Sequence, residues 1–394
     1  MPAAAPAISR YFSNAVNVGL TEDERSFLDA AKAFASSHLE PNAARWDQEK
    51  FFPVDVLREG ANLGFAAIYS SAEHGGTGLK RLDASVIFEQ LAMADPSTTA
   101  YISIHNMCAW MVDSFGSEEL KKELVPKLSS MEWFASYCLT EPSSGSDAAS
   151  LRTTAKDCGD YYEVTGSKAF ISGGGTSDVY ITMVRTGTEG PKGITCLAID
   201  ATLPGVSAGK NENKLGWNSQ RTAIISFDGV KVPKSRIVGK EGEGFKIAMK
   251  GLDGGRVNIA TCSLGAAQRA LDLTIAYTKD RKQFSTPIAE FQNTQFKLAE
   301  MATKVHTSRL AIREAARALD RQDPDATTYC AMAKLHGTEQ CFEVVDDALQ
   351  LHGGYGYLKD YPIERFLRDL RVHRILEGTN EVMRMIVGRT LLKE

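Results

Sequence analysis

The sequence predicts an α+β protein with a helical region, a mostly antiparallel β region and a second helical region, in that order. Three observations predict this arrangement. Apolar residues recur at helical spacing up to about Trp133, a strand-like period follows, and long helical stretches return from Gly244. A chain of 394 residues is long enough for two or three domains with sizeable cores. We expect a leader at 1–19, a helical domain at 20–133, a β domain at 134–243 and a helical bundle domain at 244–394.

The N-terminal region begins with a leader, and the first twenty residues of the chain contain no acid and one arginine. Such a composition fits an organelle transit peptide and equally a plain disordered leader. At Thr21 the sequence Thr-Glu-Asp-Glu forms a capping box, which marks the start of the first helix. Apolar spacing predicts further helices at Pro53–Leu63, Leu82–Ala94, Thr98–Ser114 and Ser117–Leu128.

The middle region consists of short β-branched or aromatic runs separated by Gly, Pro, Asp and Ser clusters. No long helical segment intervenes, so we expect a mostly antiparallel sheet or a small barrel. The runs are Phe134–Leu139, Tyr161–Thr165, Val179–Arg185, Ile194–Asp200 and Ala223–Phe227.

The C-terminal region contains three helical stretches that are longer than an average globular helix. With a final helix from Thr379 they predict a four-helix bundle. The stretches are Phe245–Asp280, Ile288–Asp320 and Asp325–His352.

The composition argues against several classes of protein. A formal net charge of −4 gives no general attraction to nucleic acid or anionic membranes. No run approaches the ~20 apolar residues that are needed to span a bilayer. The seven cysteines include no C-x-x-C pair and the seven histidines no H-E-x-x-H pair, which argues against a metal site. The nearest glycine pattern, Gly242-Glu243-Gly244, lacks the third glycine of a dinucleotide-binding fingerprint.

Glu377 is the candidate catalytic residue, in the segment Ile375-Leu376-Glu377-Gly378-Thr379-Asn380-Glu381. Thr379 is a plausible N-cap and Glu381 a first-turn acid, so Glu377 would lie in the turn before a helix. A carboxylate there can be desolvated and its pKa raised towards ~6–7, which suits a general base. On spacing alone, an ordinary exposed acid beside a helix cap is the more common explanation.

Five other segments are candidate binding segments. Tyr137–Asp147 leaves a strand for a Gly/Ser turn, whose hydroxyls and N–H groups suit a flavin ring or a phosphate. Phe170–Ser172 offers an aromatic plane beside a hydroxyl, or a plain strand end. Gly254 and Gly255 weaken a helix, which fits either close approach of a ligand or close helix packing. Arg281 could bind phosphate in forked fashion, and Gln350–Gly356 is either a C-cap or a phosphate loop.

These motifs together, in this order, resemble the acyl-CoA dehydrogenase family from Leu20 to the end of the chain. The resemblance is carried by Y-C-L-T-E-P-x-x-G-S-D, F-I-S-G, L-D-G-G-R, R-K-Q-F, Q-x-H-G-G-Y-G-Y and I-L-E-G-T-N-E. It implies an oxidoreductase that binds FAD non-covalently and passes electrons to electron-transferring flavoprotein. It also implies a homotetramer built as a dimer of dimers. Glu377 would remove the α-proton of an acyl thioester, and the β-hydride would pass to flavin N5.

The resemblance also implies roles for the binding residues. The residues expected to contact FAD are Tyr137, Cys138, Leu139, Thr140, Gly145, Ser146, Phe170, Ile171, Ser172, Arg281, Phe284, Phe291, Gln292, Gln350, Leu351, His352, Gly353, Gly354, Thr379, Asn380 and Glu381. In this family, the Arg281, Phe291–Gln292 and Gln350–Gly354 groups typically serve the neighbouring subunit. The residues expected to contact the CoA ester are Ser146, Asp253, Gly254, Gly255, Arg256, Gly378 and Arg389.

Three segments indicate the branch of the family. Tyr101–Met111 and Leu215–Gln220 are similar to the branch that acts on isobutyryl-CoA in mitochondrial valine breakdown, which favours a mitochondrial matrix location. Branches that carry their base beside the arginine of the L-D-x-x-R helix have an acid where this chain has Gly255. Asp253 and Phe291 depart from the isobutyryl pattern, which has asparagine and a polar residue there.

Alternatives to this assignment remain open. A short straight-chain or 2-methylbutyryl-CoA dehydrogenase fits the same motifs. An acyl-CoA oxidase would usually be longer, and a non-catalytic assembly scaffold would not need Glu377.

Overall fold

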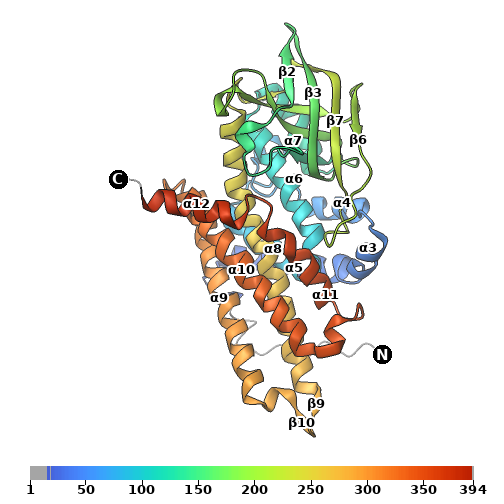
Figure 1. Ribbon diagram of the computed structural model, residues 1–394, viewed down its shortest axis with the longest axis vertical. Coiled ribbons are helices and arrows are strands. Elements are labelled where there is room, and N and C mark those ends of the chain that lie inside the picture. The colour runs from blue at the N-terminus through green and yellow to red at the C-terminus, as the bar shows by residue number, and fades with distance from the viewer. Residues whose placement is uncertain (1–15, 18, 393–394) are drawn as a thin grey trace.

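The computed structural model describes residues 16–17 and 19–392, so the predicted leader at 1–19 lies almost wholly outside the described residues. The sheet occupies one end of the molecule and the long C-terminal helices the other (Figure 1). The described helices include none long and apolar enough to cross a membrane.

Helices form the first region, as the sequence predicts. The capping box at Thr21 is confirmed, because the Thr21 N–H donates to Glu24 Oε2 at 2.7 Å and the Glu24 N–H donates to Thr21 Oγ1 at 3.2 Å. The short helix α3 and a π-helical turn over residues 35–39 were not predicted as separate elements. The helices are α2 (Glu22–Phe34), α3 (Ala43–Glu49), α4 (Val54–Asn62), α5 (Arg81–Ala94), α6 (Pro96–Phe115) and α7 (Glu118–Ser129).

The middle region is a mostly antiparallel sheet in the order β6-β7-β3-β2-β4-β5-β8. Strand β1 pairs with β4 in parallel, which brings the chain leaving the helical region beside the sheet centre. Strands β3 and β7 are longer than predicted, since bulges near Gly166 and between Lys168 and Ile171 let them continue. The strands are β1 (Ala135–Cys138), β2 (Thr154–Asp157), β3 (Tyr161–Ser172), β4 (Val179–Arg185), β5 (Ile194–Asp200), β6 (Val206–Ala208), β7 (Thr222–Pro233) and β8 (Ile237–Val238).

The C-terminal region consists of long helices lying side by side, with α5 packed on α8 and α9. A small hairpin of β9 (Lys282–Gln283) and β10 (Thr286–Pro287) joins α8 to α9 at the far end of the molecule (Figure 1). The helices are α8 (Gly244–Asp280), α9 (Gln292–Asp320), α10 (Ala326–His352), α11 (Ile363–Leu370) and α12 (Asn380–Leu391). Helix α12 packs on α10 and projects to the side.

Trp217 connects the β region to the chain just before Glu377. Its backbone is left-handed, with φ +56°. Its N–H donates to Asp369 Oδ1 at 2.6 Å, and its indole N–H donates to His373 Nε2 at 3.0 Å. His373 Nδ1 lies 2.7 Å from Ser263 Oγ on α8, and burial lowers the pKa of His373 to about 3. The imidazole is therefore neutral and bonded on both sides, so it fixes the loop against two helices.

Candidate active site

Glu377 lies in a strained turn that leads into α12. Glu377 and Gly378 are both left-handed, with φ values of +57° and +85°. A left-handed conformation is unfavourable for a residue with a Cβ atom, so neighbouring groups must hold it. The predicted N-cap is confirmed, because Thr379 Oγ1 accepts a hydrogen bond from the Val382 N–H at 3.2 Å.

The Glu377 carboxylate points at α8. The residue as a whole is partly exposed, but its Oε2 atom is buried and has no hydrogen-bond partner in the described part of the chain. A Cβ added to Gly255 would overlap the carboxylate and stand 2.8 Å from its Cδ. Burial raises the pKa of Glu377 to about 7, and the charges of Arg256 and Lys334 oppose that rise. The raised pKa expected from the sequence is therefore confirmed.

Gly254, the neighbour of Gly255, faces Arg81 instead. A Cβ on Gly254 would stand 2.9 Å from Arg81 Cζ. The Arg81 guanidinium stacks on the Tyr69 ring at 3.6 Å and on the Trp110 ring at 4.6 Å, and its Nη1 has no hydrogen-bond partner among described residues. Because Gly254 and Gly255 have no side chains, Arg81 and Glu377 can both lie close to the same stretch of α8.

The Tyr137 loop approaches the same place from the sheet. The Tyr137 hydroxyl is buried and unpaired in the described structure, and burial followed by the charge of Glu377 raises its pKa. Phe170, left-handed at φ +58°, is 73% exposed at the end of β3. The side chains of Cys138 and Ile171 pack in the core of the sheet, so these two residues can offer only backbone to a ligand.

Several predicted binding residues use their polar atoms within the chain. Asp253 pairs with Arg256 at 2.7 Å and accepts a hydrogen bond from Thr327 Oγ1 at 2.8 Å. Burial raises the pKa of Asp253, although the Arg256 charge counteracts it. By contrast, Ser146, Glu381 and Arg389 are exposed.

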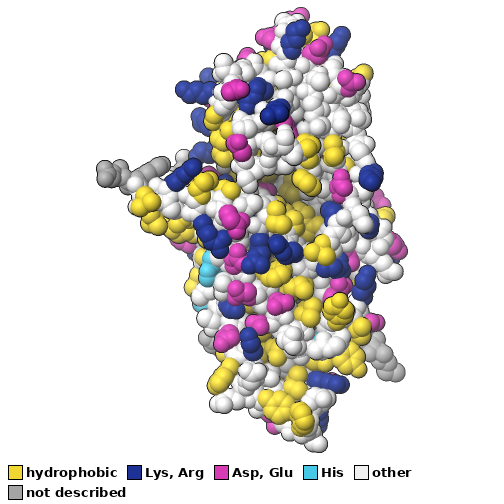
Figure 2. Space-filling view, viewed as in Figure 1, with side chains coloured by type: hydrophobic (Ala, Val, Ile, Leu, Met, Phe, Trp, Pro, Cys, Tyr) yellow, Lys and Arg dark blue, Asp and Glu magenta, His cyan; other side chains and the backbone are white. Residues whose placement is uncertain are grey.

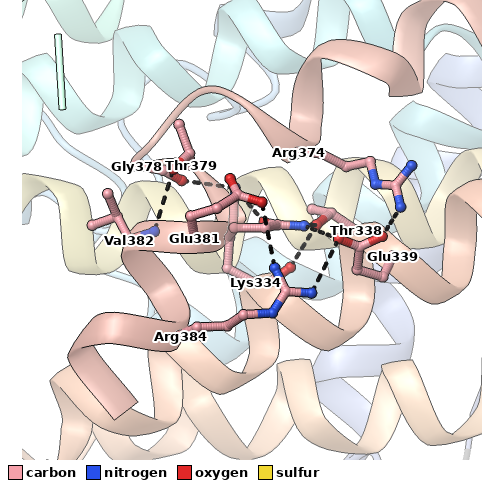
Figure 3. Close-up of polar contacts among 10 residues, drawn as sticks. Lys334, Thr338, Glu339, Arg374, Gly378, Thr379, Glu381, Val382 and Arg384 are labelled. Atoms are coloured by element: carbon pink, nitrogen blue, oxygen red, sulfur yellow. Dashed lines mark hydrogen bonds and ion pairs between the residues drawn. The ribbon is translucent and has the colours of Figure 1, made fainter. Parts of the chain in front are cut away.

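Lys334 on α10 belongs to the site, although the sequence analysis did not find it. Its ammonium donates to the Gly378 carbonyl at 2.8 Å and to Asn380 Oδ1 at 2.7 Å. Asn380 Nδ2 in turn donates to Thr338 Oγ1 at 3.0 Å and to Glu339 Oε1 at 2.8 Å. Figure 3 shows Lys334, Thr338 and Glu339 on one helix, meeting the start of α12. A signal did exist, because Lys334 lies on a buried stripe with Cys330, Thr338 and Cys341.

The remaining predicted residues gather at the far end of the bundle. Arg281 and Gln350–Gly354 line a pocket of about 460 Å³, which we call the Arg281 pocket. Arg281 forms no ion pair with any described residue; its guanidinium lies 5.5 Å from the Tyr355 ring centroid. Nearby, Phe284 is 93% exposed and Phe291 36%. Hydrophobic side chains are visible at this end of the molecule in Figure 2.

The structure therefore divides the predicted residues between two places. Tyr137, Arg256 and Glu377 meet around the middle of the molecule. Arg281 follows Gly255 by 26 residues on the same helix, which corresponds to about 40 Å of α-helix. The described residues contain no group of three or more His, Cys, Asp or Glu side chains that could hold a metal ion.

Comparison with known families identifies matches across the chain. Family models described as the acyl-CoA dehydrogenase N-terminal, middle and C-terminal domains match residues 21–132, 136–230 and 242–392. Isobutyryl-CoA dehydrogenase, mitochondrial, of Dictyostelium discoideum is 58% identical, covering 98% of this chain and 94% of its own. The Bos taurus protein of the same name is 54% identical, covering 96% of this chain and 91% of its own.

Solved structures match over nearly the whole chain as well. A chain of the structure described as the electron transferring flavoprotein of Acidaminococcus fermentans has a TM-score of 0.94 and 38% identity, covering 96% of this chain and 100% of its own. Butyryl-CoA dehydrogenase from Megasphaera elsdenii has a TM-score of 0.93 and 35% identity, covering 95% of this chain and 99% of its own.

Proposed function

The chain belongs to the acyl-CoA dehydrogenase family, and from this premise we propose that it oxidises isobutyryl-CoA to methacrylyl-CoA in valine catabolism. Family membership makes it an oxidoreductase that dehydrogenates acyl-CoA thioesters and implies a flavin cofactor. The short branched substrate is supported by two relatives, each more than half identical to this chain, that are both named isobutyryl-CoA dehydrogenase.

The observation that carries the proposal is the Glu377 carboxylate. Its Oε2 atom is buried and has no hydrogen-bond partner in the described structure, and its pKa is about 7, so the carboxyl group is partly ionised at neutral pH. A base with these properties can accept a proton from carbon without first breaking an ion pair. We assign it removal of the α-proton.

An α-C–H is a weak acid unless the thioester oxygen is polarised by hydrogen-bond donors. The backbone N–H of Glu377 donates to no described residue, so it is available for that oxygen. Arg256 donates instead to the Glu377 carbonyl at 3.3 Å, which orients the peptide unit beyond the base. The base and one oxyanion donor would then come from a single residue. Ser146, Asp253–Arg256, Gly378 and Arg389 are proposed to contact the CoA ester.

The residues present fit a flavin, and we propose FAD. The unpaired Tyr137 hydroxyl offers a donor near Glu377, the exposed Phe170 ring at the end of β3 offers an aromatic face, and no atom lies within 4 Å of a Cβ built on Gly145. The chemistry that a bound flavin supplies is acceptance of the β-hydride. Tyr137–Ser146, Phe170–Ser172 and Thr379–Glu381 would hold it, whereas residues of the Arg281 pocket would hold the FAD of a neighbouring subunit in a homotetramer.

We further propose that electron-transferring flavoprotein is the electron acceptor and that the protein works in the mitochondrial matrix. The two isobutyryl-CoA dehydrogenases carry "mitochondrial" in their names, and a chain described with an electron transferring flavoprotein shares the fold. We also propose the division into a leader at 1–19 and domains at 20–133, 134–243 and 244–394.

The test is an anaerobic titration of the flavin-loaded protein with isobutyryl-CoA, following flavin absorbance. Butyryl-, 2-methylbutyryl- and isovaleryl-CoA run in parallel. We expect isobutyryl-CoA to bleach the flavin most effectively. Glu377→Gln should slow bleaching by a factor of about 10³ or more. More effective bleaching by another ester would overturn the assignment of isobutyryl-CoA as the substrate. If no ester bleached the flavin, the chain would be a non-catalytic assembly scaffold.

A further inference from the structure

The Glu377 turn (Glu377–Thr379) is held by two buried cations. The carbonyl of Glu377 accepts from Arg256 Nε at 3.3 Å, and the carbonyl of Gly378 accepts from Lys334 Nζ at 2.8 Å. The backbones of Glu377 and Gly378 are both left-handed. Surrounding contacts must enforce this conformation for Glu377, because it has a Cβ atom. Arg256 and Lys334 belong to different helices, α8 and α10, so the turn is fixed between them.

Lys334 has the environment of a positioning group rather than of a surface lysine. Its side chain is fully buried and pairs with no carboxylate in the described structure. Two of its three N–H donors are used, on the Gly378 carbonyl and on Asn380 Oδ1. A buried ammonium is costly unless its donors find acceptors, so these contacts and the turn geometry stabilise each other.

The Asn380 acceptor is itself fixed in place. Asn380 Nδ2 donates to Thr338 and Glu339, and Glu339 also pairs with Arg374. Figure 3 shows Arg374 and Arg384 both directed at Glu339. The network therefore anchors the first residue of α12 to α10, one turn along from Lys334.

From this geometry we propose that Lys334 is a positioning residue for proton abstraction, holding the Glu377 turn so that the carboxylate lies over Gly255. The inference rests on the proposed function of Glu377. The hydrogen bonds of Lys334 go to the Gly378 carbonyl and to Asn380 Oδ1 and not to the Glu377 carboxylate, so it acts through the backbone of the turn.

The electrostatics of the site agree with this role. The charged groups that face Lys334 are Glu377 in the turn, Arg256 on α8 and Glu381 on α12. Burial lowers the pKa of Lys334 to about 7, Glu377 raises it and Arg256 lowers it further. The charge of Lys334 in turn lowers the pKa of Glu377. Removing that charge should therefore raise the pKa of the base and move the acidic limb of the kcat profile to higher pH.

The test compares Lys334→Met and Lys334→Gln in the full-length, flavin-loaded protein. The amide of Gln retains hydrogen-bond donors without the charge, whereas Met retains only the bulk. We expect Met to lower the isobutyryl-CoA kcat about thirtyfold with KM changed little, and Gln to recover most of that loss. Both variants should shift the acidic limb to higher pH. Lys304→Met, which breaks a surface pair with Glu343, is the matched control and should behave as wild type.

The outcomes distinguish a failure of the role of Lys334 from a failure of the proposed function. If isobutyryl-CoA bleaches the wild-type flavin but neither variant changes kcat or the acidic limb, the role of Lys334 is overturned and the proposed function stands. Failure of wild type with every ester overturns both. Flavin content and melting temperature show whether Lys334→Met folds. If it does not, the acidic limb of the kcat profile of Lys334→Gln is the measurement that tests the proposal. An equal fall in kcat for Met and Gln with no pH shift also overturns the proposal.

Discussion

The Glu377 turn and the Arg281 pocket contain residues predicted for one cofactor, yet they differ in almost every physical respect. At the Glu377 turn the carboxylate Oε2 is buried, the backbone is strained, and Arg256 and Lys334 donate hydrogen bonds to carbonyls of the turn. In the Arg281 pocket, Arg281 has no ion pair among described residues and Gly353 and Gly354 have open space around them, and outside its lining Phe284 is 93% exposed. The backbone of the Glu377 turn is thus held by contacts within the chain, whereas Arg281, Gly353 and Gly354 are exposed.

This difference shows that the predicted binding residues of one chain do not all lie at the same site. About 40 Å of helix separates Gly255 from Arg281, so the two regions serve opposite ends of the bundle. Under the proposed function and the proposed tetramer, a single subunit would supply the base of its own site and cofactor contacts to another subunit. Three substitutions separate the two contributions.

Gly255→Ala should have a larger effect on the bleaching rate than any change in the Arg281 pocket. The added Cβ would overlap the Glu377 carboxylate, and backbone of α8 cannot move away easily because it is buried. We expect the rate of flavin bleaching to fall about a hundredfold while flavin content stays normal. Gly388→Ala on α12, where a Cβ meets nothing within 4 Å, is the matched control. Equal rates for both variants would show that the carboxylate is not confined over α8.

Arg281→Gln should act on cofactor retention instead. Losing a charged hydrogen-bond donor to a phosphate should weaken flavin binding about tenfold, measured by flavin release on dilution. The pH dependence of the bleaching rate should remain that of wild type, because Arg281 lies far from Glu377. A shifted pH limb would mean that the two regions are not independent.

Glu377→Gln should also change the stability of the protein, in a way that depends on pH. The pKa of Glu377 is about 7 in the folded state against 4.5 for an ordinary glutamate, so folding favours the protonated form. This favourable contribution is complete below about pH 4.5 and is lost as pH rises through about 7. Removing the charge should therefore stabilise the protein at pH 8 by about 3 kcal/mol and at pH 5 by less than about 1 kcal/mol. Melting temperatures at the two pH values check this, and a larger gain at pH 5 would contradict it.

Most of the fold was predictable because it depends on local patterns. Apolar spacing and a capping box located α2 and the long helices α8, α9 and α10 to within a few residues. The full length of β3 was missed because two bulges carry the strand past Gly166, and bulges leave no regular alternation to read. Helix α11 was missed for a related reason, since it is only two turns long.

The candidate site was predictable only where a motif spans consecutive residues. Glu377, Thr379 and the glycine pair lie in two short motifs, and the raised pKa of Glu377 followed from its expected burial. Lys334 and Arg81 were missed because their roles depend on packing between helices distant in sequence. The sequence showed that Arg281 could bind phosphate, but only the length of α8 shows that it cannot share the Glu377 site within one chain.

Trp217 has a consequence for how the protein acquires activity during folding. Its two hydrogen bonds join the β region to Asp369 and to His373, which lies four residues before Glu377. His373 in turn contacts Ser263 on α8. Without the β region in place, the chain entering the Glu377 turn would lack this anchor. Catalytic competence should thus emerge as a late folding event, after the β region has docked, which keeps an immature chain from presenting a working base.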